Sequence, residues 1–216
     1  MLSNTVNIYK IQQKRVKLVK CIGISGTPGT GKSSVARELS LRLQIPLIEL
    51  STYVMENNLY VYYDELRNSY IIDEDKVRER LVEIYKKEGA LIIVGHYLEI
   101  LPRELFELVF ILRRDPYELI NILKLRGWSD HKVAENIEAE LLSICTLNAI
   151  EELGEDIIVE VDTTSKEVSA VVDEVIDIIF GVKSVYHGLR IDWLSSISEK
   201  KLSNILTYIE RYRVYQ

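Results

Sequence analysis

Cysteine is scarce in this sequence, and long apolar runs are missing. Only Cys21 and Cys145 occur among 216 residues. The first falls in an expected core strand and the second in an expected helix, which argues against a disulfide framework. No apolar run approaches the roughly 20 residues needed to cross a bilayer, and the N-terminus lacks the pattern of a secretory signal. We therefore expect a cytoplasmic protein with no membrane partner.

Positive charge is sparse in the middle of the chain. The first 20 residues carry five Lys or Arg and no acid, and the last 36 carry six Lys or Arg against three acids. Since the formal net charge is -6, residues 21–180 hold -14. Direct nucleic-acid binding is thus not indicated. A basic protein partner would suit such a body, and a solvated acidic surface explains the charge equally well.

Apolar segments of strand length alternate with amphipathic helical segments. Strands are expected at 17–25, 47–50, 90–94, 108–112 and 156–161. Helices are expected at 33–43, 73–87, 115–126, 132–151, 165–180 and 198–213, whereas 51–72 has no regular pattern. This alternation predicts an α/β fold with a parallel five-stranded sheet flanked by helices.

One glycine-rich segment carries the strongest functional signal, Gly26-Thr27-Pro28-Gly29-Thr30-Gly31-Lys32-Ser33. It matches the phosphate-binding loop pattern and lies between an expected strand and an expected helix. Glycines let backbone N–H groups turn toward phosphate oxygens. Lys32 is expected to reach the β- and γ-phosphates of ATP, and the Ser33 hydroxyl to ligate Mg²⁺. The expected nucleotide-binding residues of this segment are Gly26, Thr27, Gly29, Thr30, Gly31, Lys32, Ser33 and Ser34.

Further motifs carry a resemblance to one branch of the nucleoside monophosphate kinases. They are Tyr63-Asp64-Glu65, Ile72-Asp73-Glu74-Asp75, His96 followed by Pro102, Leu112-Arg113 and Arg126-Gly127-Trp128. With the loop, they make residues 21–178 resemble the family of adenylate kinase isoenzyme six, also called the coilin-interacting nuclear ATPase, and its archaeal relatives. The tail piece Ile191-Asp192-Trp193 is similar to archaeal members.

The resemblance implies an adenylate-kinase-like P-loop domain over 1–183, with a nucleotide-monophosphate-binding insert near 50–72 and a lid near 125–135. A partly helical extension would follow over 184–216. Family members bind and hydrolyse ATP, and some transfer phosphoryl to AMP, giving two ADP. They assist small ribosomal subunit maturation and rRNA processing together with a basic ribosomal protein of the platform. Two alternatives stay open: an ATP-gated binding module with little turnover, and a small-metabolite kinase.

Three side chains outside the loop are candidates for the chemistry. Arg126 matches the lid arginine that contacts ATP in the family, although a cation ending a helix is also a common C-cap. His96 follows the third strand, where it could orient the attacking water, relay a conformational change or hydrogen-bond backbone. Arg113 ends the fourth strand, so it could meet a ligand or form a surface ion pair. We expect Lys32, Arg126 and His96 to be catalytic.

The sequence also departs from the family it resembles. Val94 stands where relatives often have an acid that holds Mg²⁺ through water, so either Ser33 and water hold the ion or Asp73 or Glu99 approaches it. Met55 and Ile122 replace arginines, and losing an arginine weakens the grip on phosphate. AMP phosphorylation is thus less strongly indicated than ATP binding. Tyrosines crowd the insert and suit either an interface or local packing.

Overall fold

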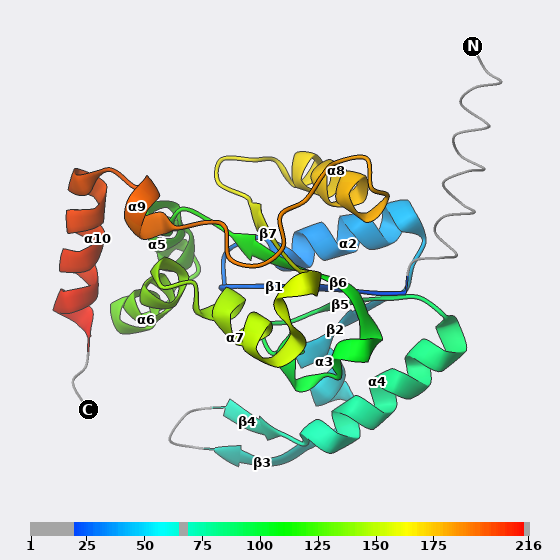
Figure 1. The fold of residues 1–216 in the computed structure, drawn as a ribbon. Coiled ribbons are helices and arrows are strands. Elements are labelled where there is room, and N and C mark those ends of the chain that lie inside the picture. Colours follow the sequence, from blue (N-terminus) through cyan, green and yellow to red (C-terminus); the bar gives the residue numbers. More distant parts are fainter. Residues whose placement is uncertain (1–19, 65–68, 214–216) are drawn as a thin grey trace.

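The computed structural model describes residues 20–64 and 69–213 (Figure 1). Five strands form one parallel sheet, which confirms the α/β fold. Their order across the sheet is β2-β5-β1-β6-β7. Their bounds are β1 Cys21–Gly26, β2 Leu47–Glu49, β5 Leu91–Val94, β6 Phe106–Arg113 and β7 Ile158–Asp162. Residues 17–19 of the first expected strand lie outside the described part.

Helices cover both faces of the sheet because side chains of its inner strands point alternately to the two sides. On one side, Ile22 and Ile24 of β1 pack in the cluster that includes α2 (Lys32–Leu43) and α8 (Val168–Ile179). On the other side, Cys21 joins a cluster with α3 (Leu50–Glu56), α4 (Glu74–Glu88) and α7 (Ile144–Leu153). Short 3-10 turns at Leu98–Ile100, Arg103–Leu105 and Glu155–Ile157 connect these elements.

A third apolar cluster lies beside the sheet and joins four helices (Figure 1). They are α5 (Pro116–Leu125), α6 (Asp130–Leu141), α9 (Trp193–Ser196) and α10 (Glu199–Tyr212). Leu119, Leu123 and Ile137 come from α5 and α6, and Trp193 and Ile205 come from the two C-terminal helices. The C-terminal segment is therefore packed against the helices that flank Arg126.

Two expectations about local structure are wrong. Residues 51–72 are not irregular, because α3 buries Leu50 and Val54, and β3 (Tyr60–Asp64) pairs antiparallel with β4 (Ser69–Ile72). The expected long helix 132–151 is two helices, since Ser143 takes a left-handed φ of 57° between α6 and α7. Left-handed backbone ends an α-helix.

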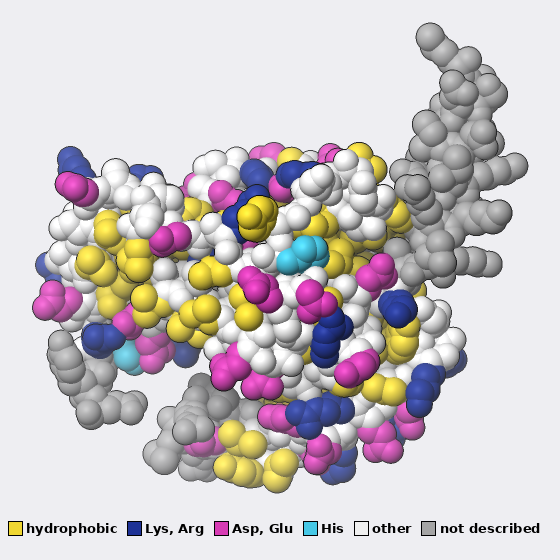
Figure 2. All heavy atoms as spheres, viewed as in Figure 1, with side chains coloured by type: hydrophobic (Ala, Val, Ile, Leu, Met, Phe, Trp, Pro, Cys, Tyr) yellow, Lys and Arg dark blue, Asp and Glu magenta, His cyan; other side chains and the backbone are white. Residues whose placement is uncertain are grey.

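The described helices include none with the length and apolar character that a bilayer crossing requires. On the face drawn in Figure 2, acidic and basic side chains are interspersed, and apolar side chains gather at the β3–β4 hairpin and over α6, α9 and α10. No field of a single sign covers this face.

Candidate active site

The phosphate loop joins the carboxyl end of β1 to α2 at the middle of the sheet, between β5 and β6. Gly26 has φ 137° and Gly29 has φ 97°, which L side chains rarely adopt. A Cβ added at Gly26 would lie 2.3 Å from the Leu112 carbonyl oxygen, and one at Gly29 would lie 2.8 Å from Leu119 Cδ2. The path of the loop between β6 and α5 thus requires both glycines.

The N-terminus of α2 has no side-chain cap. Its N-cap residue is Gly31, whereas aspartate or serine side chains cap α4, α5 and α6. The first-turn N–H groups of α2 are therefore available to an anion, as a phosphate site requires. Within the described ranges, neither the Ser33 nor the Ser34 hydroxyl bonds to another protein group, so both are also available to a ligand.

The Thr27 and Thr30 side chains hold the shape of the loop. Both residues are buried, and Thr27 Oγ1 donates to Glu140 Oε2 at 2.6 Å. Thr30 Oγ1 donates to the Thr27 carbonyl at 2.9 Å, and Thr163 Oγ1 donates to the Thr30 carbonyl at 3.0 Å. Any contact of Thr27 and Thr30 with nucleotide would thus come from their backbone, because their hydroxyls are engaged by protein.

Lys32 lies against the loop with its charge only partly hydrated. Its Nζ is 3.5 Å from the Thr27 carbonyl oxygen. Burial lowers the pKa of Lys32, and the neighbouring Arg126 charge lowers it further, while Cys145 and Glu140 act in the opposite direction. Two cations brought together in this way attract a polyanion such as a triphosphate.

Arg126 ends α5, as the sequence predicts. Its backbone N–H donates to the Leu123 carbonyl at 3.1 Å. Its side chain is exposed and forms no ion pair with any residue of the described part. The capping is therefore done by the backbone alone, which leaves the guanidinium for a ligand. Trp128 packs into the apolar cluster of α5, α6 and α10 and anchors this turn.

His96 follows β5 and lies within electrostatic range of Lys32. Its ring packs on Tyr97 with centroids 4.1 Å apart, and its nitrogens bond to none of the described residues. The alternative of a backbone-bonded histidine is thus not seen. Burial lowers the pKa of His96 to about 4, with Lys32 and Lys132 acting in the same direction. The imidazole is therefore neutral at pH 7, and its unprotonated nitrogen can accept a hydrogen bond.

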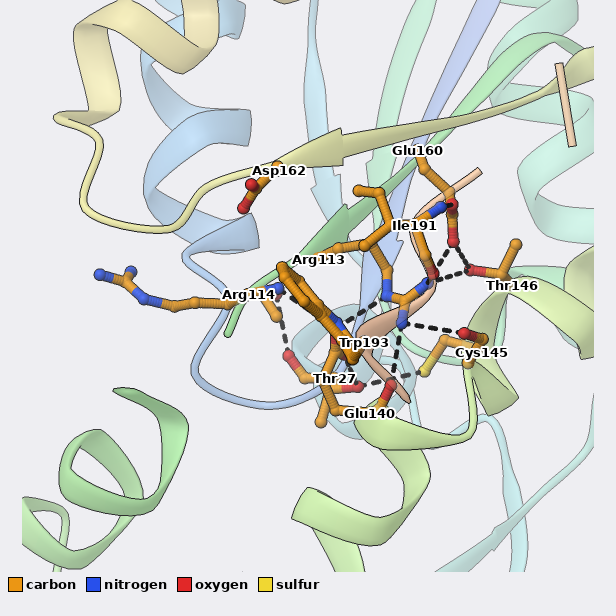
Figure 3. Close-up of polar contacts among 12 residues, drawn as sticks. Thr27, Arg113, Arg114, Glu140, Cys145, Thr146, Glu160, Asp162, Ile191 and Trp193 are labelled. Atoms are coloured by element: carbon orange, nitrogen blue, oxygen red, sulfur yellow. Dashed lines mark hydrogen bonds and ion pairs between the residues drawn. The ribbon is translucent and has the colours of Figure 1, made fainter. Parts of the chain in front are cut away.

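Arg113 takes neither of the two roles considered for it from the sequence. Its side chain is 1% exposed and lies between two buried acids (Figure 3). Nε donates to Glu140 Oε1 at 2.7 Å, Nη1 donates to Glu160 Oε1, and Nη2 donates to the Glu140 carbonyl at 2.8 Å. Burial would lower the pKa of Arg113, but Glu140 and Glu160 outweigh it and raise that pKa. Arg113 is therefore a structural cation beneath the phosphate loop.

Glu140, Glu160 and Trp193 are the residues of this network that sequence reasoning missed. Glu140 follows Val133 and Ile137 on the buried face of α6, and Glu160 lies within the apolar run of β7. An acid at an apolar position is a usable signal, because carboxylates are almost never fully buried unless paired. What the sequence does not give is the partner, since Arg113 is 27 and 47 positions away.

The residues around the loop offer only part of a binding site for the Mg²⁺ that the loop pattern predicts. Ser33 at the start of α2 can supply a hydroxyl ligand. The described residues contain no group of three or more His, Cys, Asp or Glu placed to hold a metal ion. Asp73 caps α4 and pairs with Lys76, and Glu99 lies in a buried setting that raises its pKa. The site therefore fits an ion held chiefly by nucleotide phosphates and water, as Mg²⁺ often is.

The chain is similar to several proteins whose names specify a kinase. A family profile described as an AAA domain matches residues 22–143. A "Putative adenylate kinase" of Saccharolobus islandicus is 43% identical over 154 residues, which cover 71% of this chain and 80% of that protein. One of the same name from Methanocaldococcus jannaschii is 37% identical over 158 residues, covering 73% and 85%.

Similarity extends to a eukaryotic relative and to a solved structure. An "Adenylate kinase isoenzyme 6 homolog" of Caenorhabditis elegans is 33% identical over 145 residues, covering 67% of this chain and 80% of that protein. The structure of thymidylate kinase from Candida albicans aligns with a TM-score of 0.50 and 19% identity, covering 79% and 98%. At that identity the structural likeness supports the fold alone.

Proposed function

We propose that this chain, which belongs to the family of the archaeal adenylate kinases, transfers the γ-phosphoryl of ATP to AMP or to water. Membership of that family makes it a phosphotransferase of the nucleotide kinase class. The observation that carries the ATP site is the phosphate loop, with its uncapped α2 N-terminus and the adjacent Lys32 and Arg126. These groups supply what an in-line transfer needs, because its catalysis is largely positioning and charge stabilisation.

Each residue has a distinct part in the proposed reaction. The loop N–H groups and Lys32 bind the β- and γ-phosphates, and the Arg126 guanidinium neutralises charge on the phosphoryl group in transfer. Ser33 would hold Mg²⁺, which would offset the negative charge of the phosphates. His96, neutral at pH 7, orients the attacking water by accepting a hydrogen bond from it.

The choice between AMP and water as acceptor depends on the insert. Met55 lies on α3 and is 41% exposed. Human-type members of the family that this chain resembles have an arginine at this position. A thioether cannot make the paired N–H contacts that hold a phosphate. We therefore propose weak AMP phosphorylation alongside ATP hydrolysis.

Product stoichiometry tests this proposal directly. ATP consumption and ADP formation are measured with and without AMP. Two ADP per ATP consumed identifies transfer to AMP, and one identifies hydrolysis. Lys32→Ala is the control. We expect it to lose both transfer to AMP and ATP hydrolysis while its circular dichroism spectrum stays unchanged. ATP turnover that persists in that variant would contradict the proposed site.

A role in small ribosomal subunit assembly is the finer part of the proposal, and a basic ribosomal protein is the proposed partner. The β3–β4 hairpin supports it by presenting Val61, Tyr62, Tyr63 and Tyr70 at 64, 56, 43 and 40% exposure. Tyrosine is enriched at protein interfaces. The acids at the start of α4 would attract a basic partner less strongly than their number suggests, because cations of the same helix already pair with them. Asp73 pairs with Lys76, and Glu74 and Asp75 pair with Arg78. Glu65 lies outside the described residues.

Binding of that partner would separate an assembly factor from a metabolic kinase. A titration with the small-subunit ribosomal protein is run at two salt concentrations, with ATP and with ADP. We expect tighter binding at low salt and a difference between nucleotides, since one ligand alters the affinity for another only by favouring one state. Binding that depends neither on salt concentration nor on the bound nucleotide would favour a role in nucleotide metabolism over a role in assembly.

A further inference from the structure

The C-terminal segment completes the hydrogen bonding of two acids buried beneath the phosphate loop. The backbone N–H groups of Arg190 and Ile191 donate to Glu160 Oε2 at 2.7 and 2.6 Å. Trp193 is 7% exposed, and its Nε1 donates to Glu140 Oε1 at 2.9 Å. Figure 3 shows the Trp193 ring beside Glu140 and Arg113. Without the extension, both carboxylates would lose donors that they need when buried.

The Glu140 carboxylate connects this segment to the phosphate loop. Oε1 accepts from Trp193 Nε1, from Arg113 Nε at 2.7 Å and from the Arg114 backbone N–H at 3.2 Å. Oε2 accepts from Thr27 Oγ1 at 2.6 Å. Three donors on one oxygen fix the rotation of the carboxylate, so the other oxygen is held toward Thr27.

The position of Thr27 in turn affects the loop backbone and Lys32, which are the groups proposed to bind phosphate. Its carbonyl accepts from the Thr30 N–H at 3.3 Å and from Thr30 Oγ1 at 2.9 Å, closing the turn of the loop. Lys32 Nζ lies 3.5 Å from the same carbonyl oxygen. The position of Thr27 therefore affects both the loop amides and the approach of Lys32.

The segment that carries Trp193 is itself firmly held. Ile205 and Ile209 of α10 pack in one cluster with Leu123 and Ile137. The Tyr208 hydroxyl donates to Asp130 Oδ1 at 2.7 Å. A side chain on a fixed support can position a partner more accurately than one on a loose tail.

We propose that Trp193 is a positioning residue for ATP, acting through its hydrogen bond to Glu140 and the hydrogen bond of Glu140 to Thr27. This inference rests on the ATP site proposed above. It assigns to the C-terminal extension a part in the geometry of the phosphate loop.

A double-mutant cycle between Trp193 and Thr27 tests the connection. Trp193→Phe keeps an aromatic ring but removes the N–H, and Thr27→Val keeps the branched shape but removes the hydroxyl. We expect each to lower kcat/KM for ATP by about tenfold, the size of one hydrogen bond to a charged group, with KM for AMP unchanged. Because they act on one chain of contacts, the double variant should be no worse than Thr27→Val. Losses that simply multiply would overturn the proposal.

A variant of matched stability separates positioning from packing. Ile205 is fully buried in the same cluster and makes no polar side-chain contact. Ile205→Val or Ile205→Ala is chosen to match the Tm of Trp193→Phe. We expect kcat/KM for ATP close to wild type in the matched variant. An equal kinetic loss there would show that Trp193 acts through stability alone.

The same measurements keep this inference apart from the proposed function. ATP affinity is measured together with turnover, so the cycle is decisive even where turnover is slow. If ATP binding is insensitive to Lys32→Ala, the proposed site itself is wrong, and this inference fails with it. If ATP binding depends on Lys32 but the Trp193 and Thr27 effects are independent, only the inference about Trp193 fails.

Discussion

Thr27 and Glu140 are 113 positions apart in the sequence, yet Thr27 Oγ1 donates to Glu140 Oε2 at 2.6 Å in the buried floor of the phosphate loop. The loop is thus fixed by more than its glycines. Glu140 comes from α6, and it is held in turn by Arg113 at the end of β6. Strand, loop and helix therefore meet in one polar network in which every described buried side-chain N and O atom has a partner.

Lys32→Ala should abolish turnover while leaving the fold intact. Lys32 is partly buried at a ligand site and holds no ion pair among the residues described. Losing a preorganised charge at a phosphoryl-transfer site costs about 100-fold or more in kcat. Steady-state kinetics and a urea unfolding curve measure the two effects. Lys87→Ala, an exposed lysine at the end of α4, is the control and should behave as wild type.

Arg126→Ala should lower kcat for ATP more than it raises KM. An arginine that acts on charge formed in transfer is worth more in the transition state than in the ground state, and we expect a loss of about 100-fold or more in kcat. Stability should change little, because the cap of α5 is made by the backbone N–H of Arg126.

Lys124→Ala provides the comparison on the same turn. Its Nζ lies 4.7 Å from the Tyr208 ring centroid and pairs with Asp130, so it should affect stability rather than kcat. An Arg126→Ala enzyme with unchanged kcat but a lowered Tm would support the C-cap interpretation instead.

The fold was largely predictable from the sequence because its signals are local. The Val- and Ile-rich strands are bounded by glycine and proline, and each helix carries an apolar face of the right period. The failures came from tertiary effects. Ser143 breaks the expected helix 132–151 with a left-handed φ that no glycine marks. The β3–β4 hairpin has tyrosine rings in tilted contact in place of alternating apolar and polar residues.

The place of the phosphate loop was predictable because the loop needs only contiguous residues, and it lies between β1 and α2 as its pattern predicts. Which of its residues bind nucleotide stays a prediction. Arg113 was misassigned because its role depends on Glu140 and Glu160, which approach it only in the folded sheet. The proposed role of Trp193 depends on the packing of the C-terminal extension against α6. No local sequence pattern predicts that packing.

Met55→Arg should lower the apparent KM for AMP. The side chain lies on α3 and is exposed, so an arginine can be placed there without disturbing the core. A guanidinium in the insert would pair with the AMP phosphate. Met55→Gln is the uncharged control, and kcat/KM for AMP is the measurement. An unmoved KM would point to another basic group; Arg67 is a candidate and lies outside the described residues.

Arg113→Met should destabilise the fold strongly. It leaves two buried carboxylates without their shared cation, and breaking a buried ion pair in this way costs about 3–5 kcal/mol. Arg113 makes two such pairs, both with side chains at most 1% exposed. Urea unfolding gives the change in free energy.

The triple variant with Glu140→Gln and Glu160→Gln should recover part of that loss, because neutral amides tolerate the absence of a cation. Arg42→Met is the exposed comparison. Its pairs with Glu38 and Asp173 lie at the surface, where such pairs contribute about 1 kcal/mol or less. Equal losses in Arg113→Met and Arg42→Met would mean that burial of the network has no energetic consequence.

Unfolding should show a specific dependence on pH that originates in His96. Burial lowers the pKa of this imidazole from its ordinary value of 6.5 to about 4 in the folded chain. The unfolded chain therefore binds more protons than the folded chain between these values, and the free energy of unfolding falls as pH falls from about 6.5 toward 4. Above 6.5 both states are neutral and His96 contributes no slope.

His96→Gln should flatten the stability curve in that interval alone. Urea unfolding at closely spaced pH values between about 4 and 7.5 measures the slope, and His187→Gln, an exposed histidine, is the control. If His96 also orients the attacking water, the same variant should reduce hydrolysis more than transfer to AMP, because transfer to AMP uses an ionised phosphate oxygen as nucleophile and needs no oriented water. A curve that His96→Gln leaves unchanged would mean that burial does not lower the pKa of His96 in the folded chain.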